Sequence, residues 1–287
     1  MSVTGLEGGC VANGSTCGIA SGGALGIALL NEHLLMHGET HGDEAVLITV
    51  AKYMEWFDKT YSTTQCRERN NVDFHSVMGQ LKYFLSAHKI IRCMLMAGGA
   101  LNYLTLNSHL LINGSDVGEQ EAGTPRVHCA QDVLKLVRKK TGTGNDRLER
   151  LSTVFDGGIG LKGRLCGAVA GSILALNLVH GFNLREMGYR TNVKKFIIGH
   201  INLMRKSPVE PSKRSMDTFA IGKDVVNRFK DAAGSIECRH ITGTDFDSPQ
   251  DFQEFMATSD RCGHLIQVAA DIASKAILDN KRSADNL

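Results

Sequence analysis

The amino-acid sequence predicts an all-α fold built from two related helical modules packed as a pseudo-dimer. Apolar residues recur at helical spacing in two stripes, Val46, Val50, Tyr53 and Phe57 near the start and Leu265, Ala269, Ile272 and Ala276 near the end. Neither stripe has the alternation that is typical of a strand. A segment of the first half also returns in the second half, which indicates an internal duplication.

The repeat is clearest when the chain is shifted by 149 residues, which lays Thr4–Leu30 over Thr153–Val179. Nine of the 27 paired positions are identical, whereas chance would give about two. A shift of 172 residues then aligns a second set, in which Phe57, Cys66, Arg67, Asp73 and Phe74 match Phe229, Cys238, Arg239, Asp245 and Phe246. The difference of 23 residues between the two shifts is expected as an insertion in the polar segment Arg205–Asp217.

These offsets predict the domain organisation: a first module over residues 1–112, a polar, glycine-containing linker over 113–125, and a second module over 126–287. In chain order we expect a buried helix at Ile19–Leu30, the helix with the first apolar stripe, a helix after Cys129, a helix that begins at Cys166, and a C-terminal helix. Asp73 and Asp245 are expected to cap helices.

Composition narrows the classes of function. The 32 basic and 30 acidic residues nearly balance, so no nucleic-acid partner is expected. The start of the chain lacks the pattern of an export signal, and we expect a cytoplasmic protein. The apolar run Ile19–Leu30 is shorter than the ~20 residues that a membrane span needs, so we expect no membrane span.

The eight cysteines are not expected to form structural disulfides, because a reducing cytosol keeps thiols free. Three roles remain open for these cysteines: metal ligation, redox chemistry and simple burial in the core. The chain has no CxxC, which removes the usual support for zinc knuckles, thioredoxin-type dithiols and clustered ferredoxin ligands. A site made from these cysteines must therefore be assembled from distant helices.

Cys166 is expected at the start of a helix, whose dipole would lower the pKa of its thiol. Gly167, Ala170, Gly171 and Ala175 would give this helix a face of small side chains, suited either to an inorganic group or to tight helix packing. The preceding GxGxxG segment, Gly158–Gly163, binds dinucleotides only after a buried strand. Because no such strand is predicted, nucleotide binding is not expected.

Several segments together resemble a known family. HCAQDVLKL from His128, GGIGLKGRLCGAVAG from Gly157, and the later Cys238 and Cys262 resemble the C_GCAxxG_C_C family, whose members are described as redox-active. The resemblance covers about 150 residues, and its four cysteines arrive in the family's order. The first half resembles a degenerate copy with CGIASGG at Cys17, but without the leading cysteine helix.

The resemblance implies a cofactor and a set of ligands. The related module of split-Soret cytochromes is associated with an iron–sulfur centre, which implies a [2Fe–2S] or [4Fe–4S] cluster held by Cys129, Cys166, Cys238 and Cys262. Nearby glycines would let the backbone approach the cluster: Gly157, Gly158, Gly160, Gly163 and Gly167. The first copy would form a second site or a vestige of one from Cys17, Cys66 and Cys93, with or without Cys10.

Histidines offer weaker signals. His33, His37 and His41 have a spacing that would suit a metal or a haem, but Gly38 and Gly42 interrupt that helix and favour an exposed polar end. His128 could donate a hydrogen bond to a cluster, although an ordinary surface histidine is expected there.

The sequence therefore predicts an electron carrier with an iron–sulfur cluster and an unidentified redox partner protein, rather than an enzyme that transforms a substrate. One alternative is a thiol–disulfide oxidoreductase in which Cys166 attacks and a second cysteine resolves. Another is a zinc protein with four thiolate ligands. Self-association into a homo-oligomer is compatible with any of these.

Overall fold

The helical class is confirmed by a computed structural model, which describes residues 4–36, 40–107, 126–181 and 218–285 together with 188, 190, 191, 194, 198 and 201. Within these residues the chain forms α-helices, short 3₁₀ turns and isolated β-bridges, but no strand. The predicted linker 113–125, the expected insertion Arg205–Asp217 and His37 lie outside the described residues.

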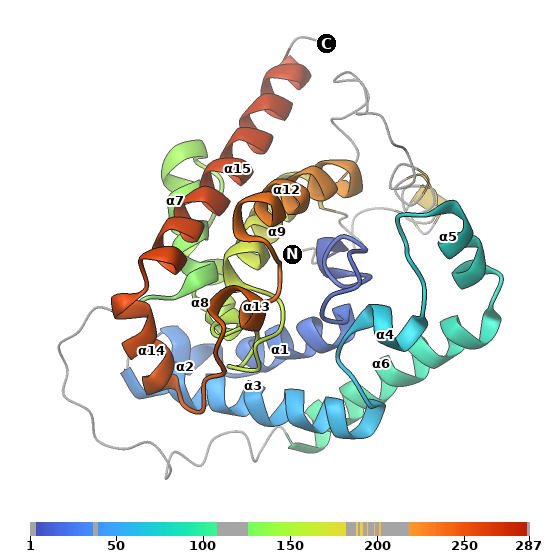
Figure 1. Cartoon of the computed structure of the whole chain (residues 1–287), viewed down its shortest axis with the longest axis horizontal. Coiled ribbons are helices and arrows are strands. Elements are labelled where there is room, and N and C mark those ends of the chain that lie inside the picture. Colours follow the sequence, from blue (N-terminus) through green and yellow to red (C-terminus); the bar gives the residue numbers. More distant parts are fainter. Residues whose placement is uncertain are drawn as a thin grey trace.

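The helices of the two modules follow one another in the same order (Figure 1). The corresponding pairs are α1 (Gly18–Leu30) and α9 (Gly167–His180), α3 (Thr40–Tyr61) and α12 (Thr218–Ala233), α4 (Cys66–Asn70) and α13 (Cys238–Thr242), α5 (Val77–Phe84) and α14 (Pro249–Thr258), and α6 (Ala87–Asn107) and α15 (Asp260–Asp285). Two short turns, η1 (Thr4–Leu6) and η2 (Ser152–Phe155), precede α1 and α9, and α2 (Glu32–Met36) follows α1. The second module also has α7 (Cys129–Thr141) and α8 (Asp146–Leu151), which have no counterpart in the described part of the first.

Backbone hydrogen bonds repeat at the two sequence offsets. In the first module Cys17 N donates to Thr64 O at 2.7 Å, and Cys66 N donates to Ser15 O at 2.8 Å. In the second, Cys166 N donates to Ile236 O at 2.8 Å and Cys238 N donates to Arg164 O at 2.7 Å. The same short ladder therefore ties two cysteine-bearing helix starts together in each module.

A left-handed turn of five residues precedes this ladder in both modules. Gly157–Leu161 have φ angles between 57° and 80°, and Gly8–Ala12 have φ angles between 50° and 79°. Residues with a side chain rarely adopt this region, yet Ile159 and Leu161 do so here. Glycines occupy the most crowded positions, because a Cβ on Gly158 would lie 2.5 Å from Arg164 N.

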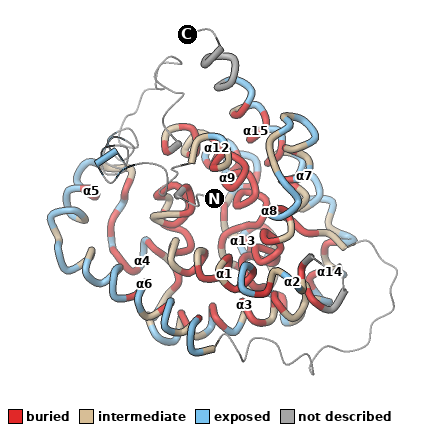
Figure 2. The backbone as a smooth tube through the Cα atoms, turned by 180° about the vertical axis from the view of Figure 1, so that it is seen from behind, coloured by how far each residue is buried: buried red, intermediate tan, exposed pale blue. Residues whose placement is uncertain are grey.

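The modules pack through equivalent surfaces across a pseudo-two-fold axis. Val11 of the first module lies against Gly222 in α12, and the equivalent residue Gly160 lies against Val50 in α3. Near the axis Leu165 N donates to Thr16 Oγ1 at 3.1 Å. Buried residues are concentrated at this junction, in and around α1 and α9 (Figure 2).

Among the described residues, the ion pairs across this junction all take their acid from the same module. The acidic partner belongs to the first module and the basic partner to the second in Glu32–Arg147, Glu44–Arg126, Glu55–Lys162 and Asp58–Arg164. Individually such surface pairs contribute little to stability. Together they distinguish one module's face from the other's.

Helix α7 gives the second module a fuller bundle, because α7, α9, α12 and α15 pack on one another. The first module ends instead at an edge formed by α5 and α6 (Figure 1). This edge exposes large apolar side chains, with Met78 73% exposed and Leu95 71% exposed. No single described helix is long and apolar enough to cross a membrane, although α5 and α6, which meet at a 71° bend, meet those two criteria as a pair.

The cap prediction for Asp73 and Asp245 is wrong. The N-cap of α5 is Ser76, whose hydroxyl accepts from Gly79 N, and the N-cap of α14 is its equivalent, Ser248. Asp245 instead pairs with Arg239. The shorter hydroxyl, three residues further along, satisfies the first-turn N–H groups that the carboxylates were expected to reach.

Candidate metal centre

Four cysteines that are far apart in the sequence line one pocket in the second module. Cys129 begins α7, Cys166 is the N-cap of α9, Cys238 begins α13, and Cys262 lies in the first turn of α15. All four line the same pocket. Each thiol therefore comes from the start of a different helix, and the bundle brings those starts together.

The pocket has apolar walls. Its lining includes Ile241 of α13, Phe252 and Met256 of α14, and Leu265 and Ile266 of α15. Its cavity volume is about 20 Å³. The thiols are thus the strongest metal donors facing a small, largely apolar space.

The thiols do not gather at a single point. Among the described residues, no three His, Cys, Asp or Glu side chains converge closely enough to hold one metal ion. A tetrahedral zinc site requires such convergence. An iron–sulfur cluster places several iron ions between its thiolates, and so suits cysteines that surround a space.

The expectation of a lowered pKa for Cys166 is wrong. Burial raises the pKa of this thiol to about 12, against the opposing effect of the N–H groups of Ala168 and Val169. Burial likewise raises the pKa of Cys129 and of Cys238. Desolvation outweighs the helix dipole at this depth, so the free thiols of Cys129, Cys166 and Cys238 are neutral and require a bound cation to become thiolates.

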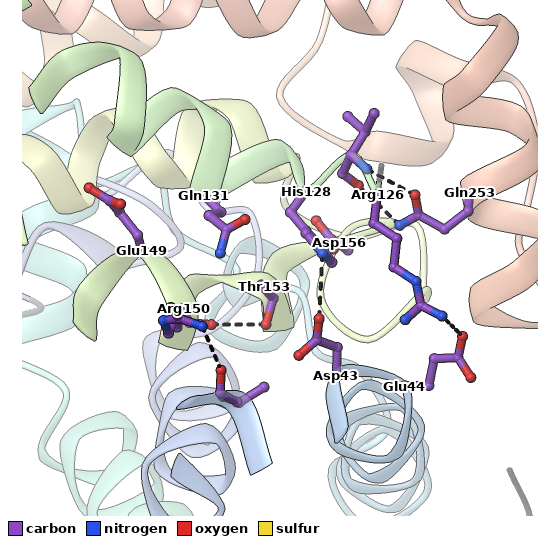
Figure 3. Close-up of polar contacts among 12 residues, drawn as sticks. Asp43, Glu44, Arg126, His128, Gln131, Glu149, Arg150, Thr153, Asp156 and Gln253 are labelled. Atoms are coloured by element: carbon purple, nitrogen blue, oxygen red, sulfur yellow. Dashed lines mark hydrogen bonds and ion pairs between the residues drawn. The ribbon is translucent and has the colours of Figure 1, made fainter. Parts of the chain in front are cut away.

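A buried carboxylate organises the start of α7 (Figure 3). Asp156 Oδ1 accepts from Cys129 N at 2.9 Å, and Asp156 Oδ2 lies 2.6 Å from His128 Nδ1. The other ring nitrogen of His128 faces Asp43 Oδ2 at 3.6 Å. His128 is 8% exposed, so the prediction of an ordinary surface histidine is wrong.

Asp156 and His128 form a buried pair in which each group influences the pKa of the other. Burial opposes a charge on either group, but Asp156, together with Asp43 and Asp132, more than compensates at His128 and raises the pKa of its imidazole. The sequence did contain a signal for Asp156, since the 149-residue shift aligns it with another acid, Glu7. A polar cavity of about 380 Å³ lies beside His128 and is lined by charged side chains such as Arg126, Lys135 and Arg150.

The proposed cofactor-binding glycines have different roles. Gly167 lines the pocket, and a Cβ there would lie 2.7 Å from Cys129 Cβ. A Cβ on Gly158 would lie 2.6 Å from Cys238 Cβ. By contrast, Gly157 packs on Phe246, Gly160 on Val50, and Gly163 on Arg239. Gly157 and Gly160 belong to the left-handed turn and Gly163 follows it, and none of the three lines the pocket.

The small face of α9 serves helix packing at one position. A Cβ on Gly171 would lie 2.7 Å from Ala130 O in α7. The absence of a side chain therefore lets the two helices approach closely. Tight packing is therefore confirmed at Gly171, while Gly167 lines the pocket, where room for an inorganic group stays a prediction.

The cysteines of the first module divide into two groups. Cys17 is the N-cap of α1, Cys66 begins α4, and Cys93 lies in α6. Burial, together with the neighbouring Cys17 and Cys93, raises the pKa of Cys66 to about 12. Cys10 does not join this group, because it is fully buried and lies near Cys166 and Glu237 of the other module.

The histidine series gives no metal cluster in the described part of the chain. His33 is exposed on α2, as an exposed polar end would require. His37 and the side chain of His41 lie outside the described residues.

Comparison with known proteins agrees with the duplication. A family model described as "Putative redox-active protein (C_GCAxxG_C_C)" matches residues 1–105 and 127–276, which correspond to the two modules. No curated protein and no solved structure matched the chain. Since the family model covers most of the sequence and both sets of cysteines, the chain belongs to the C_GCAxxG_C_C family of redox-active proteins.

Proposed function

We propose that the protein is an electron carrier whose second module binds an iron–sulfur cluster through Cys129, Cys166, Cys238 and Cys262. The observation that carries this proposal is the meeting of four helix starts, each with a cysteine, at one apolar pocket. When bound, such a cluster supplies one-electron chemistry. Its potential depends on burial, net charge and hydrogen bonds to sulfur.

The residues of the pocket have separate roles in this proposal. The four thiolates bind the cluster, and the N–H groups of Ala168 and Val169 stabilise negative charge on Cys166. Phe252 and Leu265 exclude water from one side. Asp156 fixes the start of α7 through Cys129 N, and thereby the position of the Cys129 thiol.

Two alternatives are less well supported. A thiol–disulfide oxidoreductase needs a nucleophilic thiolate in an electropositive, accessible place, whereas burial raises the pKa of Cys166 to about 12. A zinc protein needs donors that converge on one ion, and no three such groups in the described part of the chain do so.

Metal analysis of the full chain tests the proposal. Protein purified without oxygen should contain iron and acid-labile sulfide in comparable amounts and should have visible absorbance. Cys166→Ser should lose the iron bound by the second module. Cys10→Ser is the matched control, because Cys10 is equally buried but does not line the pocket, and it should retain that iron.

The alternatives predict different results from the same preparation. Colourless protein with one zinc per chain would support the zinc site and reject the cluster. Protein with neither metal after reconstitution with iron and sulfide would support thiol chemistry.

A further inference from the structure

Arg69 in the first module is a buried cation without a partner. Its side chain belongs to α4 and the residue is 7% exposed. None of its three guanidinium nitrogens has a hydrogen-bond partner among the residues that the structure describes. The guanidinium lies over the Phe57 ring at 4.9 Å and near the Tyr61 ring at 5.9 Å. Aromatic faces offset only part of the desolvation of a buried charge, so an anion is needed at this place.

The groups nearest to this charge are thiols. At Cys17 burial raises the pKa of the thiol, and Arg69 is the largest opposing influence. Arg69 acts in the same direction on Cys66. Cys93 completes the group, since its charge acts on both other cysteines and its sulfur accepts from Tyr83 OH at 3.6 Å. Two thiols at the starts of α1 and α4, the thiol of Cys93 in α6 and the cation of Arg69 thus influence one another.

The internal repeat shows which residue of the second module corresponds to Arg69. The 172-residue shift aligns Arg69 with Ile241, and Ile241 lines the cysteine pocket of the second module. Arg69 therefore occupies the position of a pocket wall. The first module has replaced an apolar wall by a positive charge and lacks a counterpart of Cys129 among its described residues.

We propose that the first module binds a second iron–sulfur cluster, held by Cys17, Cys66 and Cys93, with Arg69 as its buried counter-charge. This inference rests on the proposed function of the second module. Three thiolates supply one negative charge fewer than four, and Arg69 adds a positive charge beside them. Both differences favour the reduced state, because reduction adds a negative charge. The first-module centre therefore has the higher potential.

One cysteine of each group lies near the contact between the modules. Cys17 and Cys166 each follow a residue of the Thr16–Leu165 contact, in which Leu165 N donates to Thr16 Oγ1 at 3.1 Å. Because successive Cα atoms are about 3.8 Å apart, the Cα atoms of Cys17 and Cys166 are within about 15 Å of each other. An electron released by a reduced centre in the second module would be accepted by an oxidised centre in the first, so the transfer would balance without another reactant. The higher potential in the first module would favour transfer in that direction.

Iron content and redox titration of the full chain test this inference. Wild type should show two one-electron steps in a potentiometric titration followed by electron paramagnetic resonance. Cys93→Ser, at a half-buried position, and Cys66→Ser should each lose the step at higher potential and about half of the iron. Arg69→Ile, which restores the residue of the second module, should move that step alone to lower potential. Arg69→Lys keeps the charge and should move it less.

The outcomes separate this inference from the proposed function. Wild type without iron and sulfide would overturn both. Iron that is lost in Cys166→Ser but fully retained in Cys66→Ser and Cys93→Ser would overturn only the second centre. Two steps that both stay unchanged in Arg69→Ile, with helix content preserved by circular dichroism, would overturn the role of Arg69.

Discussion

Asp156 joins two neighbours that the second module needs. One oxygen accepts from the first amide of α7, and the other contacts His128. The carboxylate is 1% exposed, so its loss would leave both a buried donor and a buried imidazole without their partner. The position of Cys129 thus depends on a side chain 27 residues away in the sequence.

We expect Asp156→Ala to lower the free energy of unfolding by about 3–5 kcal/mol, because removing one member of a buried charged pair is strongly destabilising. Urea denaturation of the purified chain measures this loss. Asp245→Ala is the control, since Asp245 forms an exposed pair with Arg239 and should cost only about 0–1 kcal/mol. Equal losses in the two variants would contradict the structural role of Asp156.

Glu7, the equivalent of Asp156 in the first module, predicts a dependence of stability on pH. Burial raises the pKa of this carboxyl from 4.5 to about 8. Between these values the folded chain holds a proton that the unfolded chain releases, so rising pH lowers stability, by at most about 1.4 kcal/mol per pH unit. Above the folded pKa the dependence disappears.

Glu7→Gln should remove this contribution, because glutamine does not titrate. The stability of the variant relative to wild type should therefore increase from about pH 5 to about pH 8, as measured by urea denaturation at several pH values. A constant difference over that range would show that Glu7 ionises normally in the folded chain.

At the scale of elements, the left-handed turn positions the cysteines. Gly157–Leu161 reverse the chain before the ladder that joins Cys166 to Cys238. Gly158 faces Cys238 so closely that a Cβ would lie 2.6 Å from that residue's Cβ. Gly243 has a similar φ of 72°, but a Cβ there would meet nothing within 4 Å. A substitution at Gly243 therefore tests backbone strain alone, whereas a substitution at Gly158 tests backbone strain together with steric overlap.

Gly243→Ala should cost about 1–2 kcal/mol, the penalty of a left-handed residue with a side chain. Gly158→Ala should cost about 2–5 kcal/mol, because overpacking adds to that penalty. Thermal and urea denaturation of both variants measure the difference. If the two substitutions were equally destabilising, the contact with Cys238 would have no energetic role.

At the scale of the whole molecule, the two modules contact each other at two equivalent places where a valine packs against a glycine. Val11 lies against Gly222, while the equivalent pair has glycine at 160 and valine at 50. We expect Gly222→Val to destabilise the chain by about 1–3 kcal/mol through overlap with Val11. Adding Val11→Gly should recover much of the loss, since it recreates the arrangement of the other pair and suits a φ of 50°.

A double-mutant cycle on these two positions measures the coupling by denaturation. We expect a favourable coupling of about 0.5–3 kcal/mol, as is usual for residues in contact. Additive effects of the two substitutions would show that the positions do not touch in solution.

The sequence predicted the helical class, the duplication and the grouping of Cys129, Cys166, Cys238 and Cys262, because periodicity, repeats and family resemblance are properties of the chain itself. It did not predict the burial of His128 or the left-handed conformation of Ile159 and Leu161. These depend on what packs around a residue. The raised pKa of Cys166 was missed for the same reason, since depth in the fold outweighs position on a helix.

The charge pattern at the junction has a consequence for assembly. Acids such as Glu55 and Asp58 lie on the first module, and bases such as Lys162 and Arg164 lie on the second. Under the two offsets, Lys162 and Arg164 correspond to Asn13 and Ser15, and Glu55 and Asp58 correspond to Asn227 and Lys230. A dimer of two first halves would therefore lack these bases, and a dimer of two second halves would lack these acids. The charge pattern thus favours the pairing of unlike halves over either homodimer.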